Sequence, residues 1–304
     1  MRAEKLGKWY GNVLGLSDIS IEIGPGITGL LGPNGAGKST FMKLVTGQLR
    51  PSIGAVTIGG RPVWNNPDIF RRVGFCPEQD AFYEEMTGRE FLAGLLGLFG
   101  FGPDEVRKRT EQALEFVELT EAADRTIRGY SRGMRQRLKI SQSLAHEPDI
   151  LILDEPLNGL DPLSKRKVIR LIKEYRTEGR TVLVSSHVLP EIEALTKSIV
   201  LIHQGKILAE GDIHHIRGLI DTHPHIVAVR TSDPRGLAGR FIGEAEVRSV
   251  RFDETEGTAL FETNNRDRFF ERLTRLASSP EFDVEEITSP DDNLQSVFDY
   301  LVGK

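Results

Sequence analysis

The 304-residue chain has little cysteine and no long apolar run, and each absence excludes a class of protein. A single cysteine, Cys76, cannot form an internal disulfide framework and fits a reducing compartment. The most apolar run without charge is residues 91–102, whereas a membrane-spanning helix needs about 20 residues. The first five residues also lack the apolar core of a signal peptide. The sequence therefore predicts no membrane span, although a membrane partner is not excluded.

An excess of positive charge is also missing. The chain has 39 Lys and Arg residues against 44 Asp and Glu residues, for a net charge of −5. Proteins that bind nucleic acid by neutralising its phosphates are usually basic, so the composition argues against a nucleic-acid partner. The hydrophobic fraction of 39% and the charged fraction of 27% are ordinary for a soluble protein, and the length suffices for two domains.

Residues 32–40 carry the strongest motif in the chain, a complete match to the phosphate-binding pattern G-x-x-x-x-G-K-[ST]. The motif follows a strand-like apolar run, 27–31, and precedes a helix-like segment, 41–45. In that context, backbone N–H groups and the positive end of a helix point at one anion. We expect Lys38 to reach the β- and γ-phosphates of a nucleoside triphosphate and Ser39 to bind Mg²⁺. The predicted nucleotide-binding residues of this loop are Gly32, Pro33, Asn34, Gly35, Ala36, Gly37, Lys38, Ser39 and Thr40.

A second motif consists of four apolar residues, 150–153, followed by the carboxylates Asp154 and Glu155. The apolar run predicts a buried strand, whose carboxyl end would place Asp154 beside the phosphate loop as a Mg²⁺ ligand. Glu155 would then orient and polarise the attacking water. Apolar strands that end in acidic residues are common, so this pattern gains its meaning from the phosphate loop in the same chain.

The order of strand and helix patterns predicts two domains. In residues 1–217, apolar strand patterns are separated by helical ones, which is typical of an α/β domain with a mostly parallel sheet. Residues 218–304 show the order βαββαβα, with a last helix beginning near Ser289, and predict a small α+β domain. This second domain contains no catalytic motif. A regulatory module, a dimer contact and a structural appendage all remain open as its role.

Residues 130–134, Tyr-Ser-Arg-Gly-Met, resemble the Leu-Ser-Gly-Gly-Gln pentapeptide of the ATP-binding subunits of ABC transporters. Ser131 and Gly133 match that pattern, whereas Arg132 replaces its first glycine. The resemblance covers residues 3 to about 215. It implies a P-loop NTPase cassette with a mostly parallel sheet, an antiparallel β subdomain and a helical subdomain. Outside the family, a serine at a helix start would simply be an N-cap.

The resemblance also implies roles for residues that by themselves would indicate no function. Tyr10 falls where the family stacks an aromatic ring on adenine, with Trp9 as the rival. Asp161 belongs to the segment through which two subunits touch, and His187 stands at the switch-histidine position that contacts the γ-phosphate. In the Mg²⁺-sensing position, counting from Pro77 favours Glu78, while the adjacent Gln79 has the family's residue type. Both alternatives stay open. The implied metal ligands are Ser39, Gln79 and Asp154, and the implied catalytic residues are Glu155, His187 and Lys38.

A cassette of this kind implies an ATPase that needs ATP and Mg²⁺ and works as a head-to-tail pair. Each Ser131 would cap the ATP of the other subunit, in a homodimer or with a paired homologue. The resemblance is strongest to exporter subunits, which implies a separate transmembrane permease and a peripheral location at the cytoplasmic face of the cell membrane. The alternatives are a soluble ABC-type ATPase acting on another macromolecule, which usually carries two cassettes, and a P-loop kinase or GTPase, which would leave Ser131 and His187 unexplained.

Overall fold

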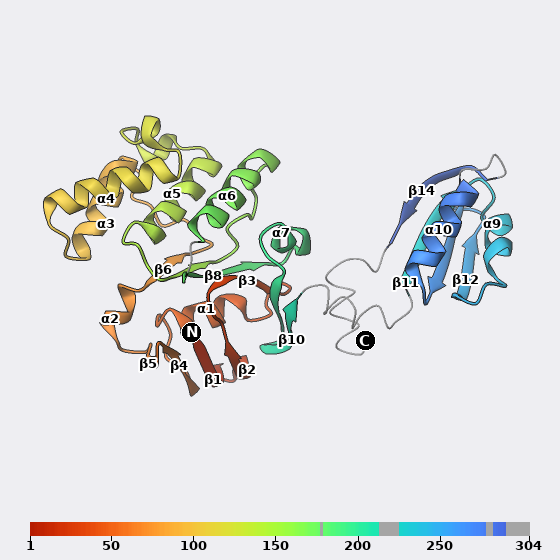
Figure 1. The fold of residues 1–304 in the computed structure, drawn as a ribbon, viewed down its shortest axis with the longest axis horizontal. Helices are drawn as coiled ribbons and strands as arrows, with labels where there is room; N and C mark the ends of the chain where they lie inside the picture. Colours follow the sequence, from red (N-terminus) through yellow and green to blue (C-terminus); the bar gives the residue numbers. More distant parts are fainter. Residues whose placement is uncertain (177–178, 213–224, 278–281, 290–304) are drawn as a thin grey trace. The chain divides into compact units, whose positions relative to one another are not determined.

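The computed structural model describes residues 1–176, 179–212, 225–277 and 282–289 (Figure 1). The chain divides into two compact units, Met1–Ile213 and His214–Lys304. The predicted domain boundary after residue 217 falls outside the described residues. Among the helices that are described, none is both long and apolar enough to cross a bilayer.

The first unit is built on a six-stranded sheet in which every neighbouring pair is parallel except the hairpin at one edge. In spatial order its strands are β10 (Lys206–Asp212), β9 (Ser198–His203), β3 (Gly26–Leu31), β8 (Thr181–Ser186), β7 (Ile150–Leu153) and β6 (Val73–Cys76). All residues of β7 and β8 are buried, as is typical of central parallel strands. Strand β7 is continuously apolar, whereas β8 also buries Thr181, Ser185 and Ser186. The predicted α/β fold class is therefore confirmed.

A smaller antiparallel sheet and one helix cover one face of the central sheet (Figure 1). Its strands, in spatial order, are β2 (Val13–Glu22), β1 (Arg2–Tyr10), β4 (Ile53–Ile58) and β5 (Arg61–Pro62). Helix α1 (Lys38–Val45) presents Phe41, Met42 and Leu44 to a core shared by both sheets. Phe41 is 2% exposed, and burying a side chain of this size contributes about 2 kcal/mol. The phosphate loop is thus anchored by a helix that cannot move without opening this core.

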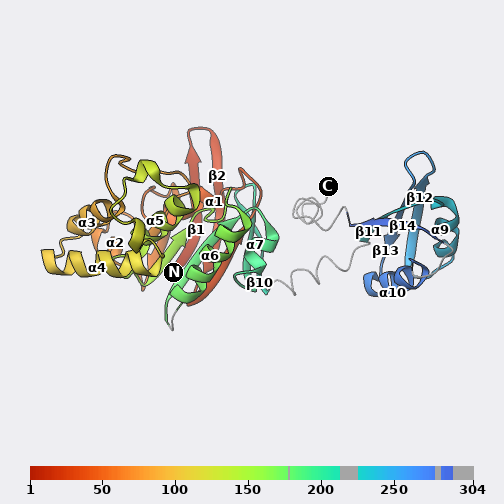
Figure 2. The same cartoon turned by 90° about the horizontal axis from the view of Figure 1, so that it is seen from above.

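Helices cover the other face of the central sheet. They are α3 (Gly88–Leu98), α4 (Pro103–Phe116), α5 (Arg132–Leu144), α6 (Pro162–Tyr175) and α7 (Leu189–Glu193), and α2 (Pro67–Phe70) precedes β6. Helices α3, α4 and α5 pack on one another as a helical group, which Figures 1 and 2 show on one side of the strands. Thr87 and Glu90 form a capping box that fixes the start of α3. The predicted helical subdomain corresponds to this group.

The second unit is a four-stranded antiparallel sheet with two helices packed on one face (Figure 2). In chain order its elements are β11 (His225–Thr231), α9 (Pro234–Phe241), β12 (Val247–Asp253), β13 (Thr258–Thr263), α10 (Arg266–Ala277) and β14 (Val284–Thr288). Phe241, Phe261 and Phe269 are fully buried and contact one another at ring-centroid distances of 4.8–5.1 Å. The order βαββαβ agrees with the prediction, whose last helix lies outside the described residues.

A buried histidine between α5 and β7 makes the stability of the first unit depend on pH. Burial lowers the pKa of His146 from 6.5 to about 4, and its ring stacks on Phe99 at 4.3 Å. Below pH 6.5 the unfolded chain takes up a proton that the folded state accepts only near pH 4, so stability falls as pH falls through this window. We expect a loss of about 3 kcal/mol between pH 6.5 and 4, measured by urea unfolding.

The matched comparison for that experiment is His146→Phe, which keeps a ring of similar shape beside Phe99 and removes the titrating group. Its unfolding free energy should lose about 3 kcal/mol less than that of the wild type over the same pH range. An equally steep pH dependence in this variant would contradict the assignment to His146.

Candidate functional site

The phosphate loop joins β3 to α1 in a conformation that requires glycine at two positions. Gly35 and Gly37 have φ angles of +81° and +106°, in the left-handed region that favours residues without a Cβ. A Cβ on Gly37 would also approach Leu16 Cδ2 to 2.8 Å, so space as well as backbone conformation excludes a side chain there. The amides of the first turn of α1 therefore face the loop with no side chain in front of them.

Lys38 begins α1 and lies buried beneath the loop. Its Nζ donates a hydrogen bond to the Gly32 carbonyl oxygen at 2.7 Å and forms an ion pair with Glu155 Oε1 at 3.1 Å. The two side chains of this pair are each only 6% exposed. Glu155 Oε1 has no hydrogen-bond partner although it is buried, so the ion pair alone offsets its desolvation.

Two carboxylates stand at the carboxyl end of β7, beside the end of β8. Asp154 is 3% exposed, and its Oδ1 accepts a hydrogen bond from Ser185 Oγ at 2.7 Å. The same Oγ accepts the backbone N–H of Glu155 at 2.8 Å. Glu155 has a φ of +48°, and its Oε2 lies 3.0 Å from His187 Nδ1. Lys38, Asp154, Glu155 and His187 are thus brought into one connected cluster.

Ser185 was missed by the sequence reasoning. In the structure Leu153 pairs with Val184 in the parallel register, and this pairing places the next residues, Asp154 and Ser185, side by side. The sequence carries no signal for this register, so the bridge became visible only in the fold.

A cavity of about 700 Å³ opens over the phosphate loop. Tyr10, 45% exposed, lines its outer side, and the hydroxyl groups of Tyr10 and Thr40 lie 3.4 Å apart. Trp9, the rival aromatic residue, is not among the lining residues. Residues Gln204 and Gly205 of the β9–β10 turn also line the cavity, and Gly205 N–H donates to the Ala36 carbonyl oxygen at 2.9 Å. The sequence analysis did not place this turn in the site.

An adjacent cavity of about 500 Å³ lies between the residues that follow β6 and helix α5. Glu78 and Glu155 line both cavities, whereas Gln79 lines only the second. The backbone of this segment is held by Lys139, whose Nζ donates to the Glu78 carbonyl oxygen at 2.7 Å and pairs with Asp80 at 3.0 Å. Glu78 is therefore the member of the ambiguous pair that faces the phosphate loop.

Seven of the predicted site residues do not line the phosphate-loop cavity: Gly32, Gln79, Ser131, Gly133, Asp154, Asp161 and His187. Three of them stand at helix starts. Ser131 is the N-cap of α5, where its Oγ accepts the Met134 N–H at 3.3 Å, and Gly133 lies in the first turn. Asp161 caps α6, accepting N–H bonds from Leu163 and Ser164 at 3.0 Å. Hydrogen bonding to Ser164 lowers the pKa of Asp161, so this cap is charged at neutral pH. Ser131 and Asp161 are exposed, and both stand at helix N-termini.

The hydroxyl of Ser39 and the carboxylate of Asp154 are groups that fit a Mg²⁺ ion. Magnesium prefers hard oxygen ligands and one or two carboxylates. Ser39 offers a hydroxyl in the cavity wall, and the buried carboxylate of Asp154 is held from behind by Ser185. No group of three His, Cys, Asp or Glu side chains placed to hold a metal ion occurs among the described residues, so a metal here would rely on phosphate and water for its other ligands.

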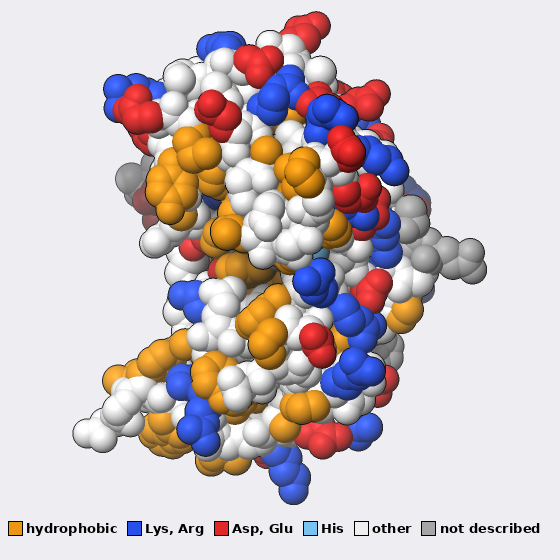
Figure 3. Space-filling view, turned by 90° about the vertical axis from the view of Figure 1, so that its left-hand side faces the viewer, with side chains coloured by type: hydrophobic (Ala, Val, Ile, Leu, Met, Phe, Trp, Pro, Cys, Tyr) orange, Lys and Arg blue, Asp and Glu red, His pale blue; other side chains and the backbone are white. Residues whose placement is uncertain are grey.

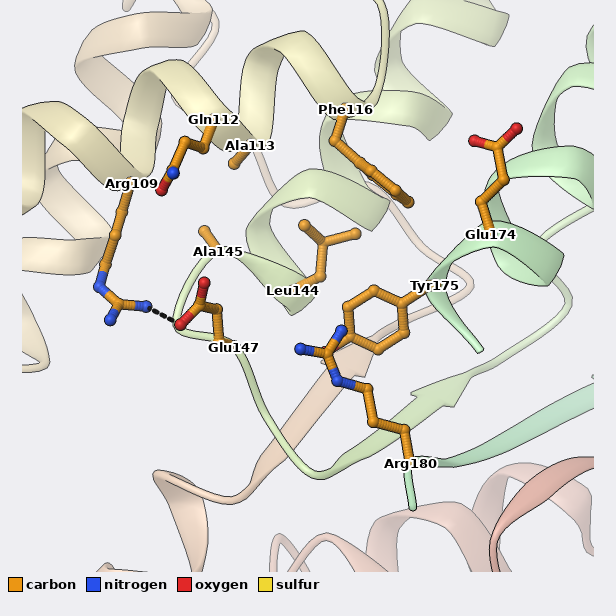
Figure 4. Close-up of a pocket in the computed structure, with 10 residues that line it drawn as sticks. All are labelled: Arg109, Gln112, Ala113, Phe116, Leu144, Ala145, Glu147, Glu174, Tyr175 and Arg180. Atoms are coloured by element: carbon orange, nitrogen blue, oxygen red, sulfur yellow. Dashed lines mark ion pairs between the residues drawn. The ribbon is translucent and has the colours of Figure 1, made fainter. Parts of the chain in front are cut away.

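A further cavity of about 310 Å³, between α4, α5 and α6, contains none of the predicted site residues (Figure 4). Arg109 and Glu147 form an ion pair of 2.9 Å across it, and Arg180 stacks on the Tyr175 ring at 4.5 Å. Burial raises the pKa of Tyr175 to about 12, and its hydroxyl donates to the Pro148 carbonyl oxygen. The charged groups here are used in these contacts, and the cavity carries no reactive constellation.

Comparison with known proteins shows the family to which the chain belongs. A model of the ABC transporter family matches residues 16–158. The daunorubicin resistance ATP-binding protein DrrA2 of Streptomyces coeruleorubidus is 32% identical over 307 residues, covering 100% of this chain and 95% of that protein. The linearmycin resistance ATP-binding protein LnrL of Bacillus subtilis is 36% identical, covering 69% of this chain and 68% of LnrL. The chain spans 66% and 61% of the length of two further ABC transporter ATP-binding proteins, from Nostoc and Synechocystis.

Solved structures of ABC transporter ATP-binding cassettes also match this chain. The ATP-binding subunit of an ABC transporter matches with a TM-score of 0.65 and 30% identity, covering 72% of this chain and 92% of that chain. A dimeric, post-hydrolysis ATP-binding cassette bound to ADP and Pi matches with a TM-score of 0.63 and 25% identity, covering 70% and 98%. The predicted relationship to ABC transporter subunits is confirmed: the chain belongs to the family of ABC transporter ATP-binding proteins.

Proposed function

We propose that the chain hydrolyses MgATP in a head-to-tail pair and couples that hydrolysis to export through a separate membrane subunit. The observation that carries this proposal is the cluster formed by the buried Lys38–Glu155 ion pair and the half-buried His187, with Ser131 outside the cavity that Lys38 and Glu155 line. One chain thus holds the groups that bind and attack ATP, while the group that would close over the γ-phosphate faces elsewhere.

Each residue of the cluster has a distinct task in phosphoryl transfer. Lys38 would exchange its bond to the Gly32 carbonyl for the β- and γ-phosphate oxygens, which the loop amides also bind. Glu155 would take a proton from a water molecule. The water oxygen would bond to the γ-phosphorus while the bond between the γ-phosphorus and the bridging β-phosphate oxygen breaks. His187, at 3.0 Å from Oε2, orients that carboxylate. Ser39 and Asp154 would hold Mg²⁺, which when bound would neutralise phosphate charge. Glu78 and Tyr10 would contact the Mg²⁺ shell and the adenine ring respectively.

The helix N-termini at Ser131 and Asp161 supply the contacts to a second chain. A hydroxyl and backbone amides at the start of α5 form an anion-binding end. Because Ser131 is exposed and outside its own chain's cavity, a partner's γ-phosphate is the anion it would meet. The dimeric state of the related cassette bound to ADP and Pi supports this arrangement.

Exposed apolar side chains mark the surface for the membrane subunit. Tyr83 and Leu98 are 71% and 85% exposed, and Trp64 and Phe70 are also exposed. Figure 3, viewed from the side of α2, α3 and α4, shows several apolar patches on this face. Such patches are typical of protein interfaces. The relatives named for daunorubicin and linearmycin resistance support export, and therefore a peripheral position at the cytoplasmic face of the membrane.

Mixing two inactive variants tests the shared site. Lys38→Ala removes the phosphate contact of one chain, and Ser131→Arg blocks the surface offered to the other. Each variant alone should lose ATP hydrolysis. In an equal mixture half of the dimers carry one intact site of two, so about one quarter of the wild-type rate should return.

The control is the exposed Arg128→Ala, which should hydrolyse ATP at the wild-type rate when assayed alone. A mixture that stays inactive although both variants are folded and exchange subunits contradicts the shared site. An active Ser131→Arg variant that runs as a monomer would favour the alternative of a self-contained ATPase.

A further inference from the structure

Arg132 stands between the two signature residues, Ser131 and Gly133, where the family pentapeptide has a glycine. A glycine there could make no side-chain contact. The arginine makes two, both to the loop that follows Glu155. These contacts give the substitution a specific consequence for this chain.

The guanidinium of Arg132 packs on the backbone of residues 158 and 159. Its Nη2 donates to the Asn158 carbonyl oxygen at 3.1 Å. Gly159 has a φ of +66°, and a Cβ at that position would overlap the Arg132 guanidinium. The arginine and the glycine therefore fit each other, and the loop is fixed from the side of α5.

The same loop reaches Glu78 through a side chain. Asn158 Nδ2 donates to Glu78 Oε1 at 3.2 Å. The Glu78 backbone is already fixed by Lys139, whose Nζ donates to its carbonyl oxygen. What Asn158 adds is the orientation of the carboxylate, which lines both the phosphate-loop cavity and the cavity beside α5.

We propose that Arg132 is a positioning residue that holds Asn158 so that Asn158 orients the Glu78 carboxylate toward the Mg²⁺ side of this chain's own ATP. The inference rests on the proposed function. It links the signature segment, which serves the partner's ATP, to the metal-facing carboxylate of its own site through three residues: Arg132, Asn158 and Glu78.

Amide hydrogen exchange on the nucleotide-free full-length protein tests the contact between Arg132 and the Asn158 carbonyl without an activity assay. Arg132→Gly restores the family residue and removes the guanidinium. The amides of residues 158–160 should then exchange roughly tenfold faster, since a hydrogen bond from a charged donor is lost. Arg132→Lys, which can still donate to the Asn158 carbonyl, should restore part of the protection. The control is Arg128→Ala, and unchanged exchange in Arg132→Gly overturns the proposal.

The Mg²⁺ dependence of ATP hydrolysis tests the second contact. Asn158→Asp keeps the carbonyl that Arg132 binds but replaces the amide donor by a carboxylate that repels Glu78. Arg132→Gly and Asn158→Asp should each raise the half-saturating Mg²⁺ concentration roughly fivefold, with little change in the KM for ATP at saturating Mg²⁺. The double variant should show no further rise, because both substitutions break the same path.

The link from Arg132 through Asn158 to Glu78 would be overturned if the two substitutions had additive effects on the half-saturating Mg²⁺ concentration. It would also be overturned if they changed only the KM for ATP. Binding of Mn²⁺ to the ATP complex, followed by electron paramagnetic resonance, gives the same comparison without turnover. A wild type that hydrolyses no ATP would refute the proposed function, whereas normal wild-type hydrolysis with an unchanged Mg²⁺ dependence in the variants would refute only the role of Arg132.

Discussion

Replacing Glu155 by glutamine is expected to reduce ATP hydrolysis by at least about a hundredfold while leaving ATP binding intact. The amide keeps the shape of the side chain but cannot take a proton from water. It also removes a negative charge that faces Lys38 at 3.1 Å, so the phosphate loop should accept ATP at least as well as before. ATP should then hold the closed pair, and light scattering should show an ATP-dependent dimer.

The matched control for this variant is the exposed Glu121→Gln, which removes the same charge from a surface position and should hydrolyse ATP normally. A Glu155→Gln variant that retains most of the wild-type rate would remove Glu155 from the catalytic step. A variant that is inactive but remains monomeric in ATP would separate the chemistry from the proposed pairing.

Replacing Lys38 by alanine is expected to weaken ATP binding by roughly a hundredfold, about 2.7 kcal/mol at 25 °C, because a buried ammonium no longer meets the phosphates. The same change should destabilise the nucleotide-free protein by about 3 kcal/mol, since it leaves the 6%-exposed Glu155 carboxylate without its cation. A fluorescent ATP analogue measures the first effect, and urea unfolding measures the second.

Lys43→Ala is the control, because Lys43 is exposed on the same helix and should affect neither quantity strongly. The double variant Lys38→Ala with Glu155→Gln should recover much of the lost stability, because it removes both charges. Failure to recover would show that the ion pair is not the source of the loss, and unchanged ATP binding in Lys38→Ala would contradict the phosphate-loop assignment.

The local elements of the site were largely predictable because each depends on neighbours in the chain. An uninterrupted run of four apolar residues, 150–153, is typical of a strand that is buried on both faces, and these residues form β7. Gly35 and Gly37 of the phosphate loop have positive φ angles that other residues adopt only with strain, so the glycine pattern indicates the loop's backbone conformation. The N-cap roles of Ser131 and Asp161 also follow from residue type and position.

The contacts between distant segments could not be derived in the same way. Glu155 and Lys38 are far apart in sequence, and only the sheet order places β7 and β3 on either side of β8 so that the two side chains form an ion pair. Only the structure shows that Glu78, and not Gln79, lines the phosphate-loop cavity. The contacts that hold Glu78 there come from Lys139 and Asn158, which lie far from it in the sequence. The spacing of residues in the sequence does not predict such contacts.

The sequence by itself determined the α/β class, the phosphate loop, the acidic strand end and the family to which the chain belongs, because these reside in short continuous patterns whose physics is local. The tertiary structure alone decided which side chains meet: the Lys38–Glu155–His187 cluster, the Ser185 bridge, and the path from Arg132 through Asn158 to Glu78. The reason is that burial and charge pairing are properties of packed surfaces, and packing brings together residues whose separation in the chain carries no information about their contact.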